Sequence, residues 1–340
     1  MQFATKIDAH RTPISYKYTQ LPTFPDPSTM MRALAVCILV SLITSPAMAD
    51  ASHHHKHLSK KVARHQADEV EAAVASAAEN EPSLRSNEVL VIDEETQDVL
   101  LSKNSTLVNP IASITKLMTS LVVLEANQPI DEAITITDED EDLARPSYSR
   151  LKKGMVVTRA ELLHLALMAS ENRAAHALAR TFPGGLRACI EAMNTKAQEL
   201  GMDSTHYVEP TGLSELNVSN PQDLAKLVIR ASANPTISEY STDDRFAVRL
   251  GKHMVEFHTT DRLVASPSWT IVLQKTGYIA EAGRCLVMKA IIENRATVIV
   301  LMNSTGTQTR VADAQRIKSW LDVKATKVST SLPVSSSPSL

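Results

Sequence analysis

The sequence has no excess of charge of either sign. Its 35 Lys and Arg residues nearly balance its 38 Asp and Glu residues, which leaves a net charge of -3 at pH 7. A protein that gathers nucleic acid, or lies flat on an anionic membrane, needs a field of positive charge that this composition does not supply. We therefore expect no nucleic acid partner and at most a loose association with membranes.

Cysteine is scarce as well, with three residues in a chain of 340. Cys37 falls in a segment that we expect to be removed, so Cys189 and Cys285 remain. One disulfide between these two is an open alternative. Free cysteine is among the most frequently buried residue types, so two buried thiols are the favoured interpretation.

Long hydrophobic runs are also absent, and the short run near the start has the features of an export signal. Arg32 precedes the apolar residues 33–43, and Ala47-Met-Ala49 follows them. A charged start, a short apolar stretch and an A-x-A site predict a secretory signal that is cleaved after Ala49, since the stretch is too short for a comfortable membrane span. The mature protein is expected in the periplasm.

The ends of the chain differ in composition from its middle. Residues 1–29 are polar and fit no signal design, so the leader and signal at 1–49 are expected to start at Met30 or Met31, with a genuine long leader as the alternative. Residues 50–84 indicate a flexible linker. It contains the run His53-His-His-Lys-His57, but a loose segment cannot fix metal ligands, so we expect no metal site there. Residues 324–340 are rich in Ser and Pro, which predicts a disordered tail.

The stretch between these ends, residues 85–323, has the patterns of one mixed α/β domain. Two short apolar runs at its start predict a β-hairpin, and three at its end predict further strands. Between them, residues of about 127–260 are predicted to form a mainly helical insert with runs such as 159–181, and a helix closes the domain. We therefore expect one sheet interrupted by the insert. The predicted strands are 87–93, 98–102, 269–273, 283–288 and 296–301, and the closing helix is 309–322.

Ser113-Ile-Thr-Lys116 is the first candidate for catalysis. An S-x-x-K match alone occurs by chance in a chain of this length, and Ser149-Arg-Leu-Lys152 also fits. No apolar helix follows Ser149, whereas Ser113 opens an apolar helix that runs to about Ala126. In a helix, residues three apart lie on the same face, so the Ser113 and Lys116 side chains can meet. This context favours Ser113 as nucleophile and Lys116 as its base.

A second lysine would support that mechanism, because a nearby cation and burial both favour the neutral form of an amine. Lys275-Thr276-Gly277 follows an apolar strand and supplies one. Lys275 and Thr276 could bind a substrate carboxylate there, and Gly277 leaves room for a close backbone approach. An ordinary turn at the end of a strand is the alternative interpretation.

Ser170-Glu-Asn172 is the third candidate. The pattern S-x-N is weak by itself, since residues 102–104 and 232–234 also match. Ser170 differs because it ends a long apolar helical run abruptly in polar residues, which would present a hydroxyl and an amide to a site. Hydrogen bonding at a helix end is the alternative role.

These three motifs, in this order, are those of penicillin-binding proteins and class A β-lactamases. Over residues 85–322 the chain resembles the low-molecular-mass D-alanyl-D-alanine carboxypeptidase and endopeptidase family, most closely its penicillin-binding protein 7 branch of endopeptidases. The resemblance implies a β-lactamase/transpeptidase-like fold, with a five-stranded antiparallel sheet flanked by helices and a mainly helical subdomain. It rests on the three motifs and on these stretches: 110–119, 150–154, 165–174, 182–185, 208–213 and 275–288.

The resemblance also implies roles for the catalytic residues. Ser113 is expected to be acylated by a D-Ala carbonyl after Lys116 removes its proton. Ser170 and Asn172 are expected to relay protons and hold the peptide. The backbone N–H groups of Ser113 and Tyr278 would form an oxyanion hole.

The other residues carried over from the family bind substrate. Lys275 and Thr276 are expected on the carboxylate side of the peptide, next to Gly277 and Tyr278. Arg310 could add positive charge there, with surface placement as the alternative. Peptidoglycan cross-links are the implied substrates and β-lactams the implied covalent inhibitors. The mechanism requires no metal or organic cofactor.

Four functions remain in consideration. The first is a DD-endopeptidase that hydrolyses the cross-link from D-Ala to diaminopimelate, and the second is a DD-carboxypeptidase that removes terminal D-Ala. A β-lactamase is less favoured, because Leu213 stands where a class A enzyme has its deacylating Glu. A non-catalytic peptidoglycan-binding protein would lack the motif residues. The family's Thr-Asn pair is replaced by Thr260-Asp261, with an effect on activity that the sequence leaves open.

Overall fold

The structure is a computed structural model that describes residues 81–141 and 149–331, with side chains described as far as residue 325. The predictions for the signal segment, the translation start and the histidine run lie outside these residues. In the part of the chain that is described, no helix is long and apolar enough to cross a membrane.

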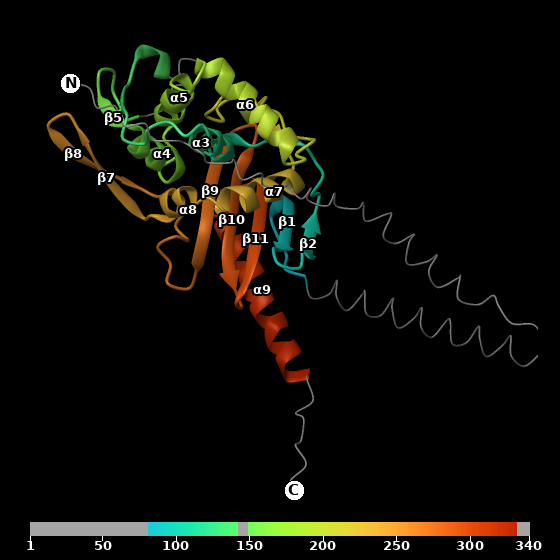
Figure 1. Ribbon diagram of the computed structural model, residues 1–340. Helices are drawn as coiled ribbons and strands as arrows, with labels where there is room; N and C mark the ends of the chain where they lie inside the picture. The colour runs from blue at the N-terminus through green and yellow to red at the C-terminus, as the bar shows by residue number, and fades with distance from the viewer. Residues whose placement is uncertain (1–80, 142–148, 332–340) are drawn as a thin grey trace, which may run out of the picture. The chain divides into compact units, whose positions relative to one another are not determined.

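A five-stranded antiparallel sheet forms the centre of the domain (Figure 1). Its order is β2-β1-β11-β10-β9, so the first strands of the domain pair with the last ones. Val89 in β1, for example, lies opposite Leu301 in β11. The predicted sheet, built from two early and three late strands, is confirmed. The strands are β1 Ser86–Asp93, β2 Val99–Lys103, β9 Thr270–Ile279, β10 Gly283–Ile292 and β11 Arg295–Ser304.

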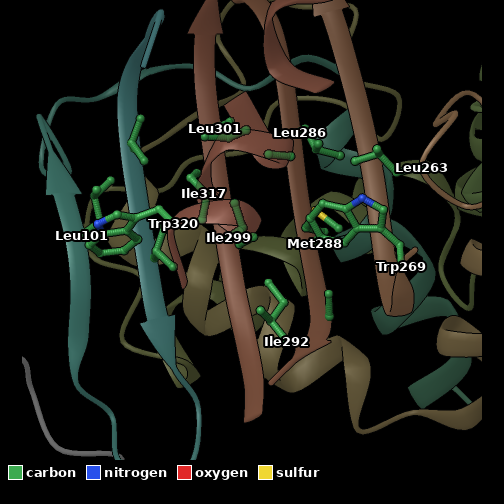
Figure 2. Packing of buried hydrophobic residues seen from close by; sticks show 14 residues of the cluster. Leu101, Leu263, Trp269, Leu286, Met288, Ile292, Ile299, Leu301, Ile317 and Trp320 are labelled. Carbon is green, nitrogen blue, oxygen red and sulfur yellow. The ribbon is translucent and has the colours of Figure 1, made fainter. Parts of the chain in front are cut away.

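Helices cover both faces of this sheet. On one face, Ile317 and Trp320 of α9 (Thr309–Ser331) pack into an apolar cluster with alternate strand residues such as Met288 and Ile299 (Figure 2). Lys289 points to the other face, where its Nζ donates a hydrogen bond at 3.2 Å to Ser232 of α7 (Pro221–Ser232). Because both faces are covered, the central strands are apolar along most of their length instead of alternating with polar residues.

The segment predicted as a helical insert contains the five helices α4 to α8, but it also holds two small two-stranded antiparallel sheets. One of its helices, α7, packs on the sheet and so belongs to the layers of the central domain. Two short strands, β3 and β6, join the chain before α3 to the chain before α7. The helices are α3 Thr115–Glu125, α4 Arg159–Leu167, α5 Asn172–Arg180, α6 Gly185–Glu199, α7 Pro221–Ser232 and α8 Pro235–Thr242. The short elements are β3 Asn109–Pro110, β4 Ala133–Thr135, β5 Val156–Thr158, β6 Val218–Ser219, β7 Arg245–Leu250 and β8 His253–His258, with single turns of 3-10 helix at Ala112–Ile114 and Asp138–Asp140.

Local sequence signals explain where several helices begin. Thr158 caps α4 by accepting a hydrogen bond from the Glu161 N–H, and the Glu161 carboxylate accepts one from the Thr158 N–H in return. Asn220 caps α7, and Pro221 occupies its first turn, where a missing N–H costs nothing. These caps satisfy backbone donors that a helix start leaves unpaired.

Of the boundaries that differ from the predictions, three bear on the site or on the C-terminal tail. The helical run predicted from Arg159 to Thr181 is broken into α4 and α5, because Ser170 adopts a left-handed backbone with φ of 59°. Strand β9 continues through Tyr278, so Lys275 lies within a strand and the turn interpretation is wrong. Helix α9 continues to Ser331, past both its predicted end and the predicted start of the disordered tail.

The two remaining cysteines form no disulfide. Cys189 and Cys285 are both free and buried, in line with the favoured interpretation of two buried thiols. Burial raises the pKa of the Cys189 thiol to about 12 and that of Cys285 to about 11. Both side chains therefore stay protonated and act as small apolar groups in the core.

Candidate active site

Ser113 and Lys116 meet at the start of helix α3. Ser113 lies in the 3-10 turn that leads into the helix, and Lys116 lies in the first helical turn. The Lys116 Nζ is 2.9 Å from the Ser113 Oγ. Helix α3 is buried on all sides from Thr115 to Val123, so the pair stands on a fixed central element.

The other contacts of Lys116 determine how its amine is oriented. Its Nζ lies 2.7 Å from the Asn172 Oδ1 and 2.6 Å from the Thr211 carbonyl oxygen. Both of these oxygens accept hydrogen bonds and cannot donate them. A neutral amine has two N–H donors and one lone pair. With the two donors directed at Asn172 and Thr211, the lone pair faces the hydroxyl of Ser113, which is the orientation that a base requires.

Lys275 and Ser170 form a second serine–lysine pair. The Lys275 Nζ lies 2.9 Å from the Ser170 Oγ and 2.9 Å from the Thr276 carbonyl oxygen. Lys275 is fully buried, and burial holds its pKa well below the usual value, with further lowering by Lys116 and Arg310. The structure thus brings the three predicted motifs together at one place.

Two residues of the site have a backbone conformation that side chains disfavour. Ala112, directly before Ser113, has φ of 48°, and Ser170 has φ of 59°. For residues other than glycine, positive φ is uncommon and persists where surrounding structure enforces it. In both cases the unusual backbone serves to aim a serine: Ala112 sets the path into Ser113, and Ser170 turns its own hydroxyl toward Lys275.

Two glycines pack directly against the backbone before Ser113. A Cβ on Gly277 would lie 3.1 Å from the Ser113 N and 3.0 Å from the Ile111 carbonyl oxygen. A Cβ on Gly212 would lie 1.9 Å from the carbonyl oxygen of Ala112. The close approach predicted for Gly277 is therefore present, and Gly212 makes a closer one on the same stretch of backbone.

Strand β9 brings the predicted substrate-binding residues to the edge of the sheet, where it has a neighbouring strand on one side only. The Thr276 and Thr260 hydroxyls lie 2.6 Å apart. Arg310 donates from Nη1 to the Gly277 carbonyl oxygen at 3.2 Å and is half-buried, which excludes a purely surface placement. Tyr278 is 56% exposed, so it offers its backbone and ring to an incoming peptide.

The loop that lies against Lys116 falls in the stretch 208–213 of the family resemblance, but no role was predicted for it. Glu209 folds this loop: its carboxylate accepts hydrogen bonds from the N–H groups of Thr211 and Gly212 at 2.6 and 2.5 Å. The Asn217 amide donates to the same carboxylate at 2.9 Å. The fold of the loop presents the Thr211 carbonyl to Lys116. Pro210-Thr-Gly212 is a turn signal, but sequence does not reveal which carbonyl a turn exposes.

The alternative serine, Ser149, does not form a serine–lysine pair. Its hydroxyl donates to the carboxylate of Glu171, and among the described residues no hydrogen bond joins it to Lys152. Glu171 is buried, and burial raises the pKa of its carboxyl. The choice of Ser113 over Ser149 therefore agrees with the geometry.

Known proteins are similar to this chain in sequence and in fold. The chain is 41% identical to a D-alanyl-D-alanine endopeptidase of Escherichia coli over 74% of this chain and 82% of that protein. It is 44% identical to a D-alanyl-D-alanine endopeptidase of Pseudomonas aeruginosa over 70% of this chain and 78% of that protein. The crystal structure of the Streptomyces K15 DD-transpeptidase superposes with a TM-score of 0.66 at 27% identity, covering 71% of this chain and 98% of that one.

A family model agrees with these pairwise similarities. The model for the S11 peptidases, described as D-alanyl-D-alanine carboxypeptidase, matches residues 75–306. The match spans more than half of the chain and includes the two serine–lysine pairs as well as the loop at Thr211. The chain therefore belongs to the S11 family of D-alanyl-D-alanine peptidases.

Proposed function

We propose that this protein is a D-alanyl-D-alanine endopeptidase that hydrolyses cross-links between peptidoglycan peptides through an acyl-enzyme on Ser113. The observation that carries the proposal is the placement of the Lys116 amine, 2.9 Å from the Ser113 hydroxyl and held by two acceptors on its other sides. The two relatives of 41 and 44% identity both have the name of an endopeptidase.

Acylation begins with Lys116 in its neutral form. Its lone pair accepts the proton of Ser113, and the serine oxygen attacks the carbonyl carbon of the D-Ala residue. The negative charge then moves to the carbonyl oxygen, where the N–H groups of Ser113 and Tyr278 are proposed to hold it. When the peptide bond breaks, the leaving amine takes a proton from Lys116, with Ser170 as the relay. Water later releases the acyl group.

The substrate is proposed to bind as an extended strand beside β9. An edge strand has unpaired backbone groups that can form hydrogen bonds with a peptide, which is a common mode of peptide recognition. Lys275, Thr276 and Arg310 are proposed to bind the carboxylate next to the cleaved bond. The positive charge comes from Lys275 and Arg310, and Thr276 adds a hydroxyl. In a cross-link this carboxylate belongs to diaminopimelate, and in a pentapeptide it belongs to the terminal D-Ala.

Slow release of penicillin follows from the same site. In the loop against Lys116, the one carboxylate that folds the turn is Glu209, and backbone and amide donors occupy its oxygens. It is therefore engaged in structure and not free to activate a deacylating water. We propose that penicillin acylates Ser113 and remains bound, which argues against a β-lactamase.

A DD-carboxypeptidase is the second candidate, because the family model has that description. The two activities share the acylation chemistry and differ in the leaving group. Purified mature protein should be incubated separately with cross-linked muropeptide dimers and with pentapeptide monomers, and the products followed by chromatography and mass spectrometry. Loss of dimers with intact pentapeptides supports the endopeptidase. Release of free D-Ala alone would overturn it.

The nucleophile is tested with labelled penicillin. Ser113→Ala is expected to abolish covalent labelling. Ser120→Ala is a matched control, because Ser120 lies in α3, the helix that follows Ser113, is fully buried, and its hydroxyl has no hydrogen-bond partner among the described residues. Labelling that survives in Ser113→Ala would contradict the assignment of the nucleophile.

The periplasm is the proposed location, and it is supported by the predicted signal segment. Cleavage after Ala49 would leave Asp50 as the first residue. N-terminal sequencing of the protein from a periplasmic extract tests both the location and the cleavage site. A start at any residue before Arg32 in the mature protein would contradict them.

A further inference from the structure

Ser149, the serine of the second S-x-x-K match, has a contact that the proposed mechanism does not use. Its hydroxyl donates a hydrogen bond to the carboxylate of Glu171. Glu171 lies between Ser170 and Asn172, the two motif residues whose side chains meet the lysines of the site. Glu171 is 8% exposed, and a buried carboxylate costs free energy unless it has a hydrogen-bond partner. Ser149 supplies that partner.

Glu171 stands at the start of helix α5, but its side chain does not cap the helix. It occupies the N-cap position, where the side chain often accepts a hydrogen bond from the first turn. Among the described residues, the Glu171 side chain makes no such bond. Its backbone N–H donates to the Leu165 carbonyl oxygen of α4 at 3.1 Å. The backbone of Glu171 is thus tied to α4, and its carboxylate is directed at Ser149.

The short segment from Ser149 to Leu151 is itself held in place. Leu151 is fully buried, and its N–H donates to the Ser149 hydroxyl at 3.0 Å. The Leu151 carbonyl oxygen accepts a hydrogen bond from Arg173 Nη1 at 2.7 Å. Glu171 and Arg173 are therefore both attached to this segment, which fixes the beginning of α5.

Ser170 is the motif residue that depends on this attachment. It joins α4 to α5 with φ of 59°, a conformation that persists only where the surroundings enforce it. Asn172 differs, because it lies within α5, where the helix sets its backbone. If Ser170 relaxed to a common backbone conformation, its hydroxyl would leave the position 2.9 Å from the Lys275 Nζ.

We propose that Glu171 is a positioning residue that, through its hydrogen bond with Ser149, holds the Ser170 hydroxyl toward Lys275. Glu171 itself neither touches the reacting atoms nor transfers a proton. Ser149 then serves as an anchor for the site and not as a nucleophile. The inference rests on the proposed role of Ser170 as the proton relay in acylation.

The test is a double-mutant cycle, measured as the rate at which a fluorescent penicillin acylates Ser113. Glu171→Ala is expected to slow acylation about tenfold, because a small displacement of a catalytic group is costly. Ser170→Ala is expected to slow it further. In a protein that already carries Ser170→Ala, adding Glu171→Ala is expected to cause no additional loss, since Glu171 acts through the missing hydroxyl.

Variants of Ser149 remove or retain the same hydrogen bond from its other end. Ser149→Ala is expected to slow acylation as much as Glu171→Ala does, and it provides the test if the Glu171 variant does not fold. Ser149→Thr keeps a hydroxyl and is expected to have close to the wild-type rate. Circular dichroism and urea denaturation show whether each variant is folded.

Glu161→Ala is the matched control. The Glu161 carboxylate also accepts a hydrogen bond from a hydroxyl, that of Thr158 at 2.9 Å, but at the opposite end of α4 from Ser170. Its loss removes a capping box, so the free energy of unfolding is expected to fall. The acylation rate is expected to stay at the wild-type value.

A wild-type acylation rate in both Glu171→Ala and Ser149→Ala would overturn the proposal. So would an equal loss from Glu171→Ala with and without the Ser170 hydroxyl, which is the result that a general structural role predicts. Ser170→Ala measured alone tests the relay separately: a wild-type rate there would refute the proposed mechanism and this inference with it. The assay follows acylation only, so the choice between endopeptidase and carboxypeptidase does not affect it.

Discussion

The Nζ of Lys275 lies 2.9 Å from the Oγ of Ser170, so a hydrogen bond joins strand β9 to the loop between α4 and α5. The relationship repeats that of Lys116 and Ser113, at the same distance, within one site. Each lysine therefore has its own hydroxyl. This duplication is the basis for assigning attack to one pair and proton relay to the other.

Ser170→Ala is expected to slow acylation by about a hundredfold or more, the size of a typical loss of acid–base catalysis. The hydroxyl that accepts from Lys275 would be missing, and protons would lose their path to the leaving group. Stopped-flow acylation by a fluorescent penicillin measures the rate. Ser120→Ala, which removes a buried hydroxyl from α3, should leave it unchanged. A Ser170→Ala rate equal to that of the wild type would show that the pair is structural.

Lys116→Arg tests whether the first lysine acts as a base. Arginine keeps the positive charge, but its guanidinium is not deprotonated in proteins. Acylation is therefore expected to fall on the order of a thousandfold at every accessible pH, within the range for removal of a general base. The same penicillin assay, with circular dichroism to check the fold, provides the readout. A folded variant that is acylated near the wild-type rate would rule out Lys116 as the base.

Gly212→Ala is expected to destabilise the protein far more than Gly154→Ala. Both glycines have φ of 83°, so both substitutions carry the same backbone cost of about 1 kcal/mol. A Cβ on Gly212 would overlap the Ala112 carbonyl oxygen, whereas a Cβ on Gly154 meets no atom within 4 Å. Urea denaturation of both variants isolates the clash as the difference between them. Equal losses would mean that the loop at Gly212 can move aside.

Lowering the pH is expected to reduce the free energy of unfolding, because the buried carboxylate of Asp140 loses its charge. Burial alone would raise the pKa of this carboxyl, but hydrogen bonds from His176 and Arg180 outweigh it and lower the pKa from 3.8 to about 2. A carboxyl whose pKa is lower in the folded protein than in the unfolded chain stabilises the fold at pH values above its unfolded pKa. This stabilisation is lost as the pH falls toward 2. The stabilisation is about 2 kcal/mol near neutrality.

Asp140→Asn provides the measurement for that prediction. The difference in unfolding free energy between wild type and variant, from urea titrations, should be largest near neutral pH. It should shrink steadily as the pH falls from about 4 toward about 2. A difference that stayed constant over this range would show that the carboxylate charge does not stabilise the fold.

The sequence predicted the sheet and the three motifs because both depend on regular patterns. Apolar strands at each end of the domain left few ways to form one sheet. The apolar helix after Ser113 distinguished its S-x-x-K motif from the one at Ser149. These features arise from periodicity, which a single chain displays directly.

The parts that were missed depend on backbone geometry or on contacts between distant segments. The left-handed turn at Ser170 is invisible in an otherwise helical pattern, since any residue can stand there if its surroundings enforce it. The contribution of Thr211 is a carbonyl group, which every residue has. The predicted end of helix α9 came too early, because the average composition of the tail is rich in Ser and Pro although the first proline of the tail is Pro333.

The pairing of β1 with β11 determines how late in folding the active site can form. Val89 and Leu301 are adjacent in the sheet but separated by most of the domain along the chain. Contacts of such long range form late in folding, because a large loop must close first. A chain that ends before β11 would have the nucleophile and both lysines, yet no sheet to hold them together. Hydrolytic activity can therefore arise only once nearly the whole domain has been synthesised, so the site is inactive while the chain is being made.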